Sequence, residues 1–172
     1  MKKEYLIIGI VAFAIALVLI YTFTRKKEEE KIVEIDDILH LYVSYSNGYM
    51  ANSSIRYSLD YDEKEDKYTV SIKPYLVDDD DVLKKEVTKE FADKIKEILT
   101  KYEVAKWDGF NKSDQNVLDG DSFSFSVRMK NDVNISASGY MMWPKNYGKV
   151  IGEFDTLFMN IYNKEKGITE NE

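Results

Sequence analysis

The chain of 172 residues contains no cysteine. Without thiols it can form neither a disulfide, nor a thiolate metal site, nor a cysteine nucleophile, and its redox compartment is left undetermined. A single histidine, His40, excludes histidine-clustered metal sites, and a Ser-His-Asp triad would have to use this residue. No nucleophile turn of the G-x-S-x-G type accompanies it. We therefore interpret His40 as an ordinary side chain on the face of a sheet.

Basic side chains are outnumbered by acidic ones, 24 against 31, which gives a net charge of −7. Five of the basic and one of the acidic residues lie in positions 1–27, so residues 28–172 carry 19 and 30, a net charge of −11. Such a surface repels phosphate backbones, and no basic stripe is present, so nucleic acid is not an expected partner. The acidic run at residues 78–81 is typical of a solvated loop, because a cation cage needs spaced oxygens.

Motifs that carry chemistry are also missing. There is no P-loop, no dinucleotide fingerprint and no EF-hand loop, and we interpret residues 119–121, Asp-Gly-Asp, as a tight turn. Carboxylates are plentiful, so acid–base hydrolysis by an Asp/Glu pair stays open as an alternative. We predict no catalytic residue, no metal site and no cofactor.

One long hydrophobic run stands out against these absences. Residues 5–24 contain no charged side chain, and about 20 residues of helix at roughly 1.5 Å each match the thickness of a hydrocarbon core. Tyr5 and Tyr21 lie near the two ends of the run. The alternative is a cleaved signal peptide, which Ala14 and Ala16 disfavour because they lie inside the run. We predict an uncleaved transmembrane helix, with the lipid bilayer as the partner of residues 5–24.

The sequence signals for the orientation of this anchor in the membrane disagree. Basic residues are more numerous after the hydrophobic run than before it, which favours a cytoplasmic domain. A very short basic N-terminus and three N-x-Ser sequons favour the outside; the sequons begin at Asn52, Asn111 and Asn134. We expect a single-pass protein of the cell membrane with an extracytoplasmic C-terminal domain.

Three segments follow from these patterns. Residues 1–27 form the anchor with its basic flanks, and residues 28–37 form a charged stalk. Residues 38–172 are long enough for one domain with a single core.

Alternation of apolar and polar side chains predicts five strands. The first covers residues 39–45, and a hairpin follows at residues 54–61 and 68–73. A second hairpin covers residues 123–129 and 133–137.

Helical spacing appears in two places. Apolar residues recur with that spacing over residues 91–102, behind Thr88 as N-cap, and again over residues 147–161, behind Pro144. The element order is βββα-ββα. We therefore predict an α+β fold: an N-terminal transmembrane helix, then a five-stranded antiparallel sheet with two helices on its apolar face.

Two aromatic groups lie at junctions between the predicted helices and strands. One contains Trp107 and Phe110, and the other contains Tyr140 and Trp143. Tryptophans in such places usually close the end of a core; the alternative is an exposed aromatic surface for a peptide or a sugar. These four residues are the candidate binding residues.

Four short motifs recur in the C-terminal half: W-x-G-F at 107–110, V-L-D-G-x-S-F at 117–123, A-S-G at 137–139 and P-x-N-Y at 144–147. With them, residues 38–160 resemble an uncharacterised domain of membrane-anchored or lipoprotein-like surface proteins of Gram-positive bacteria and methanogenic archaea. The chain departs from that pattern at residues 131–133, which lack a turn glycine, and it has no lipid-accepting cysteine. The resemblance implies a cell-surface setting and brings no catalytic residues.

The function that these observations favour is a membrane-tethered extracytoplasmic binding or interaction module with a protein or glycan partner. We do not expect an enzyme. The alternatives are a carboxylate-based surface hydrolase and a pilin-like assembly subunit.

Overall fold

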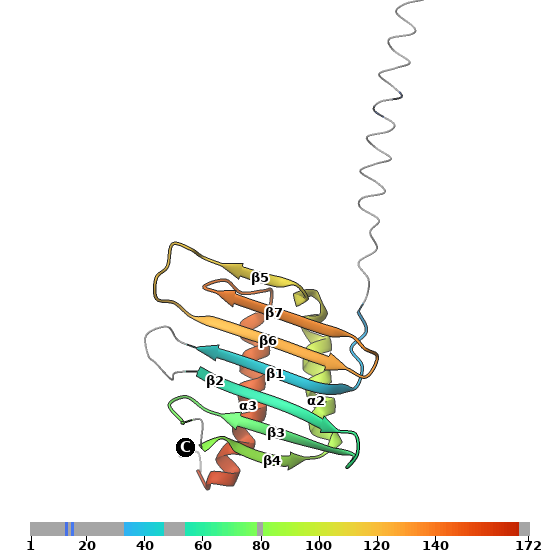
Figure 1. Cartoon of the computed structure of the whole chain (residues 1–172), viewed down its shortest axis with the longest axis vertical. Coiled ribbons are helices and arrows are strands. Elements are labelled where there is room, and N and C mark those ends of the chain that lie inside the picture. Colours follow the sequence, from blue (N-terminus) through green and yellow to red (C-terminus); the bar gives the residue numbers. More distant parts are fainter. Residues whose placement is uncertain (1–12, 14, 16–32, 47–53, 79–80, 169–172) are drawn as a thin grey trace, which may run out of the picture. The chain divides into compact units, whose positions relative to one another are not determined.

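The computed structural model describes residues 13, 15, 33–46, 54–78 and 81–168. The chain divides into two compact units, Met1–Val33 and Glu34–Glu172. The second unit is an α+β domain built on one sheet (Figure 1).

The sheet has seven strands in the order β4-β3-β2-β1-β6-β7-β5. All neighbours are antiparallel except β5 and β7, which are parallel. The strands β4 to β1 form a meander, and the β6–β7 hairpin adds to the free side of β1. The strands are β1 Ile38–Ser46, β2 Ser54–Asp62, β3 Lys67–Lys73, β4 Leu83–Val87, β5 Phe110–Ser113, β6 Ser122–Met129 and β7 Asn134–Tyr140.

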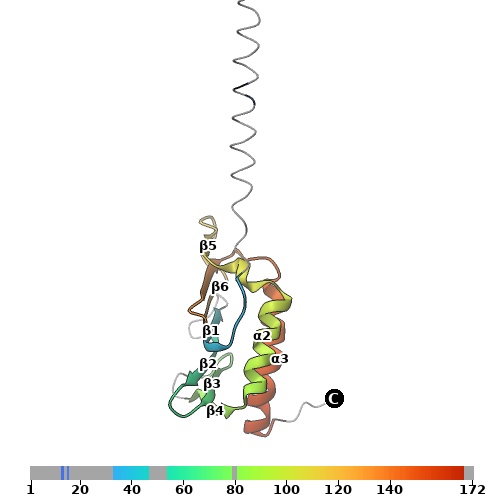
Figure 2. The same ribbon diagram turned by 90° about the vertical axis from the view of Figure 1, so that its right-hand side faces the viewer.

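Two helices, α2 (Lys89–Lys101) and α3 (Tyr147–Lys166), lie side by side against one face of the sheet, so the domain has two layers (Figure 2). A short 3₁₀ helix, η2 (Val104–Trp107), follows α2. α2 starts after Thr88, whose side chain makes no capping hydrogen bond, and α3 ends at Gly167 with a φ of 68°. A left-handed glycine at that position is a common helix stop because it has no Cβ.

The core lies between the helices and the sheet. Alternate residues of the strands face it, and the buried residues of α2 and α3 cover them. The largest fully buried side chains come from both layers: Trp107, Tyr57, Phe125, Phe154, Phe158, Ile38, Leu41, Leu59, Ile72, Ile95, Leu99 and Met129. The other face of the sheet is rich in serine and charged side chains.

The predicted sheet is wrong in two respects. It has seven strands instead of five, and it is mixed instead of antiparallel. The prediction lacks β4 and β5, the two edge strands. In β4, Leu83 and Val87 are separated by three charged residues, which hides the alternation that marks a strand; in β5, Phe110 is the only apolar residue.

The predicted single-pass membrane protein is also corrected. Across the described residues no helix is both long and apolar enough to cross a bilayer. Residues 5–24, on which the transmembrane helix, the anchor and the extracytoplasmic placement were based, lie outside the described residues except for Phe13 and Ile15. The charged stalk of residues 28–37 is described only from residue 33 onward.

Candidate functional site

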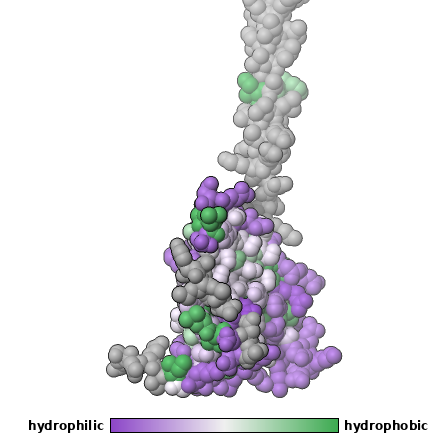
Figure 3. Space-filling model, turned by 60° about the vertical axis from the view of Figure 1, so that its left-hand side comes forward, coloured by the Kyte–Doolittle hydropathy of each residue, from purple (hydrophilic) through white to green (hydrophobic). Residues whose placement is uncertain are grey.

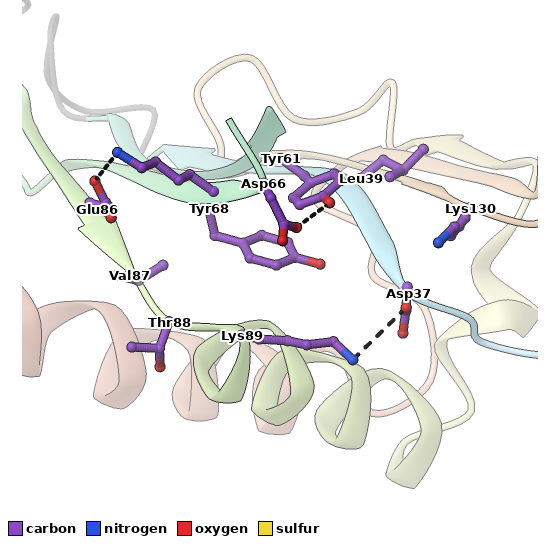
Figure 4. A pocket seen from close by; sticks show the side chains of 11 residues that line it. Asp37, Leu39, Tyr61, Asp66, Tyr68, Glu86, Val87, Thr88, Lys89 and Lys130 are labelled. Carbon is purple, nitrogen blue, oxygen red and sulfur yellow. Dashed lines mark hydrogen bonds and ion pairs between the residues drawn. The ribbon is translucent and has the colours of Figure 1, made fainter. Parts of the chain in front are cut away.

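A cavity lies at the end of the sheet where β1 begins, and we call it the tyrosine pocket. Its volume is about 510 Å³, within the range of about 300–1,000 Å³ that small-molecule sites occupy. Figure 4 shows its side chains between the strands and the first turn of α2. The lining residues are Asp37, Leu39, Tyr61, Asp66, Lys67, Tyr68, Glu86, Val87, Thr88, Lys89 and Lys130.

Two tyrosine rings in contact form one wall of this pocket. The ring centroids of Tyr61 and Tyr68 are 4.7 Å apart, because the two residues are paired directly across the β2–β3 hairpin. The Tyr61 hydroxyl donates to Asp66 Oδ1 at 2.6 Å, and this hydrogen bond raises the pKa of Tyr61 to about 12. Burial, followed by the negative charge of Asp37, raises the pKa of Tyr68. Both phenols therefore stay protonated, and neutral, at physiological pH.

Charges of both signs surround the tyrosines. Lys67 Nζ lies 3.3 Å from Glu86 Oε2, and Lys89 Nζ lies 4.0 Å from Asp37 Oδ2. The ammonium group of Lys130, in the turn between β6 and β7, has no side-chain partner among the described residues. With three lysines and three carboxylates in its lining, the pocket is close to neutral. Of these lysines, as far as the described residues show, Lys130 alone lacks a carboxylate partner and can pair with a ligand.

The tyrosine pocket is suited to binding, and we find no catalytic arrangement in it. It contains no histidine, serine or cysteine, and its carboxylates already face a donor: Asp66 accepts from Tyr61, Glu86 pairs with Lys67, and Asp37 pairs with Lys89 and Lys96. In the part of the chain that the structure describes, no group of three or more His, Asp or Glu side chains is placed to hold a metal ion.

The four sequence-predicted binding residues lie elsewhere. Trp107 is 2% exposed, and its Nε1 donates to the carbonyl oxygen of Lys145 at 3.0 Å. Trp143 is 41% exposed, and Phe110 and Tyr140 are half-buried. Trp107 therefore closes one end of the core, whereas Trp143 is at the surface.

A chain of ring contacts brings three of these residues together. Tyr147 lies 6.0 Å from Trp107 and 6.4 Å from Trp143, measured between ring centroids. It also lies 4.7 Å from Phe123, whose ring is 6.1 Å from that of Phe110. Tyr140 is not part of this cluster, because strand alternation puts it on the other face of β7 from the buried Ala137.

Sequence reasoning missed the tyrosine pocket. Tyr61 and Tyr68 were assigned only to the apolar face of a hairpin, although their position beside its polar turn, residues 62–66, is a signal of partial exposure. Asp37 and Lys130 come from segments far away in the sequence. They meet because the backbone N–H of Lys130 donates to the carbonyl oxygen of Asp37 at 2.9 Å, a contact that no local pattern predicts.

His40 lies on the polar face of the sheet, as an ordinary strand residue. Its Nδ1 is 2.6 Å from Asp60 Oδ1, and Asp60 Oδ2 accepts a hydrogen bond from Ser58 at 3.2 Å. A shallow hollow beside it includes Ser126 and Ser136, but among the described residues no serine makes a hydrogen bond to the histidine. The His–Asp pair therefore has no nucleophile in place.

The face of the domain seen in Figure 3 is mainly hydrophilic. On the face shown in Figure 3, hydrophobic side chains form small separate groups among polar ones.

No protein-family model matches the chain, and no curated protein matches it. The resemblance to an uncharacterised domain of surface proteins therefore stays a prediction.

Proposed function

We propose that the domain is a binding module, without catalytic activity, whose ligand occupies the tyrosine pocket. The observation that carries the proposal is the combination of a cavity of about 510 Å³, a pair of tyrosine rings in contact and a lysine that has no side-chain partner among the described residues. Seven of the eleven lining residues are charged or polar, and Leu39, Val87 and the two tyrosine rings form the apolar part of the wall.

The chemistry of the pocket selects a type of ligand. The rings of Tyr61 and Tyr68, together with Leu39 and Val87, suit a flat or aliphatic body. Lys130 suits an anionic group, since among the described residues no carboxylate pairs with its ammonium group, whereas Lys67 and Lys89 each have such a partner. We propose a small ligand with an apolar ring and a carboxylate or similar anion.

The two alternatives from the sequence gain nothing from the geometry. A carboxylate-based hydrolase needs two carboxyl groups facing a substrate, and the carboxylates of the tyrosine pocket are paired with lysines or with Tyr61. The pilin-like subunit depended on residues 5–24, which lie outside the described residues except for Phe13 and Ile15. A binding module is the remaining proposal.

The test uses three probes that share one ring but differ in charge: phenylacetate, phenethylamine and benzyl alcohol. Saturation-transfer NMR on the full-length chain measures the affinity of each. We expect phenylacetate to bind best, and Lys130→Gln to weaken it about 10-fold or more, because a charge-assisted hydrogen bond is lost. Lys149→Gln, an exposed lysine of α3 outside the pocket, is the matched control.

Two results would overturn the proposal. One is that phenylacetate does not bind at concentrations up to about 10 mM, weaker than the millimolar affinity of a minimal fragment. The other is that Lys130→Gln and Lys149→Gln bind phenylacetate equally well.

A further inference from the structure

A second hollow lies at the other end of β1 and contains the exposed tryptophan; we call it the Trp143 groove. Its volume is about 290 Å³, and it is bounded by the end of β1, the start of β6 and the first turns of α3. The lining residues are Tyr45, Ser46, Asp121, Ser122, Trp143, Tyr147, Gly148, Ile151, Gly152 and Asp155.

A carboxylate of α3 forms one wall of the groove. The hydroxyl groups of Tyr45 and Tyr57 both donate to Oδ1 of Asp155, the second at 2.8 Å. The other oxygen, Oδ2, has no hydrogen-bond partner among the described residues. Burial and the negative charge of Asp155 raise the pKa values of Tyr45 and Tyr57, so both phenols remain neutral donors. Asp155 therefore keeps an acceptor oxygen and an uncompensated negative charge at the groove.

The groove contains a second carboxylate and no basic side chain. Asp121 is exposed at the start of β6, and neither lysine nor arginine is among the lining residues. The positive end of the α3 dipole at Tyr147 opposes a cation, but it amounts to only about half an elementary charge. Two full carboxylate charges outweigh it. The groove is therefore negative, unlike the tyrosine pocket.

An aromatic surface and free space complete the groove. The Trp143 ring is 41% exposed and leans against Tyr147. Gly148 and Gly152 are four residues apart on α3, and a Cβ added at either would meet nothing within 4 Å. Glycine inside a helix is less favourable than alanine. Gly148 and Gly152 therefore make α3 less stable than alanine would, and their lack of side chains leaves space in the groove that Trp143 also lines.

We infer that the Trp143 groove binds an organic ammonium group. A tryptophan ring attracts a cation over its face, and quaternary or alkylated ammonium ions favour such aromatic surfaces. Asp121 and Asp155 add the opposite charge. The inference does not depend on the tyrosine pocket, because no residue lines both sites.

Choline and its uncharged carbon analogue, 3,3-dimethylbutan-1-ol, test the inference. Isothermal titration of the full-length chain at constant ionic strength should detect choline binding in the millimolar range, about 1 mM, and at least about 10-fold weaker binding of the alcohol. Trp143→Ala should weaken choline binding at least about 3-fold, and Trp143→Phe should restore part of the affinity.

Two acidic variants separate local charge from net charge. Asp121→Asn should weaken choline binding at least about 3-fold. Asp119→Asn makes the same change in net charge two residues away, outside the groove, and should leave the affinity unchanged. Neither side chain is buried, so both variants keep the fold.

Three outcomes would overturn the inference: no choline binding at 100 mM, about a hundred times weaker than expected; equal binding of choline and the alcohol; or equal effects of Asp121→Asn and Asp119→Asn. The outcome is independent of Lys130→Gln, so failure here and failure of the proposed function can be told apart.

Discussion

The sites at the two ends of strand β1 both have aromatic walls, but one is close to neutral and the other is negative. At the first end, the tyrosine pocket combines Tyr61 and Tyr68 with three lysines and three carboxylates. At the second end, the Trp143 groove combines Tyr45, Tyr147 and Trp143 with two carboxylates and no lysine. Aromatic residues alone therefore do not define what either site binds. The charges beside them do, and they make the first end suited to an anion and the second to a cation.

The largest loss of stability is expected for Trp107, which packs in the core near the Trp143 groove. Trp107→Ala removes a buried ring that contacts Phe125 and Tyr147 and donates to the Lys145 carbonyl oxygen. We expect a loss of about 3–5 kcal/mol in the free energy of unfolding, out of the roughly 5–15 kcal/mol that such domains have. Urea unfolding followed by circular dichroism measures it.

Trp143→Ala is the matched control for this variant. Its ring is 41% exposed, so its removal should change stability by less than about 0.5 kcal/mol. Equal losses for the two variants would show that Trp143 belongs to the core and would remove the aromatic surface of the groove.

A smaller loss of stability is expected for Asp155, which accepts hydrogen bonds from Tyr45 and Tyr57. Asp155→Ala leaves the hydroxyl groups of Tyr45 and Tyr57 without their acceptor between α3 and the sheet. The expected loss is about 1–3 kcal/mol, the cost of an unsatisfied polar group. Asp121→Ala, which removes an exposed carboxylate of the same groove, should stay within about 0.5 kcal/mol. Urea midpoints that coincide for the two variants would contradict a role of Asp155 in joining the layers.

The smallest effect concerns the open space of the groove. Gly152→Ala should stabilise α3 by about 0.5–1 kcal/mol, because alanine favours a helix and its Cβ meets nothing within 4 Å. The matched control is Gly109→Ala, which also has free space but a φ of 72°. A side chain is strained in that conformation, so this variant should be destabilised. Thermal unfolding of both variants compares the signs, and a destabilised Gly152→Ala would show that the space beside Trp143 is filled.

Sequence patterns predicted the interior of the sheet better than its borders. The strands at residues 39–45, 54–61, 68–73, 123–129 and 133–137 correspond to β1, β2, β3, β6 and β7, because one face of each is buried and the alternation is strong. Edge strands carry weaker signals. In β4 Lys85 pairs with Glu165 of α3 at 2.9 Å, so a charged residue occupies a position where the pattern requires an apolar one.

The sites could be predicted only in part. Trp143 was recognised as a candidate because a tryptophan beside a helix start is conspicuous. The partners that give each site its charge, Asp155 in the groove and Lys130 in the pocket, are ordinary members of a helix and a turn. Their role depends on which strands become neighbours, and the parallel pairing of β5 with β7 shows that this order does not follow the order of the sequence.

The topology has a consequence for the chain while it is being synthesised. Strand β1 finds its partner β2 within the next few residues, but its other edge is paired by residues 122–129 of β6. Until that segment leaves the ribosome, the centre of the future sheet has an open edge that can pair with another chain. β5 likewise stays unpaired until β7 follows. The nascent domain is therefore most prone to aggregation when it is about two-thirds complete. The β6–β7 hairpin ends that period, because β6 pairs with the open edge of β1 and β7 pairs with β5.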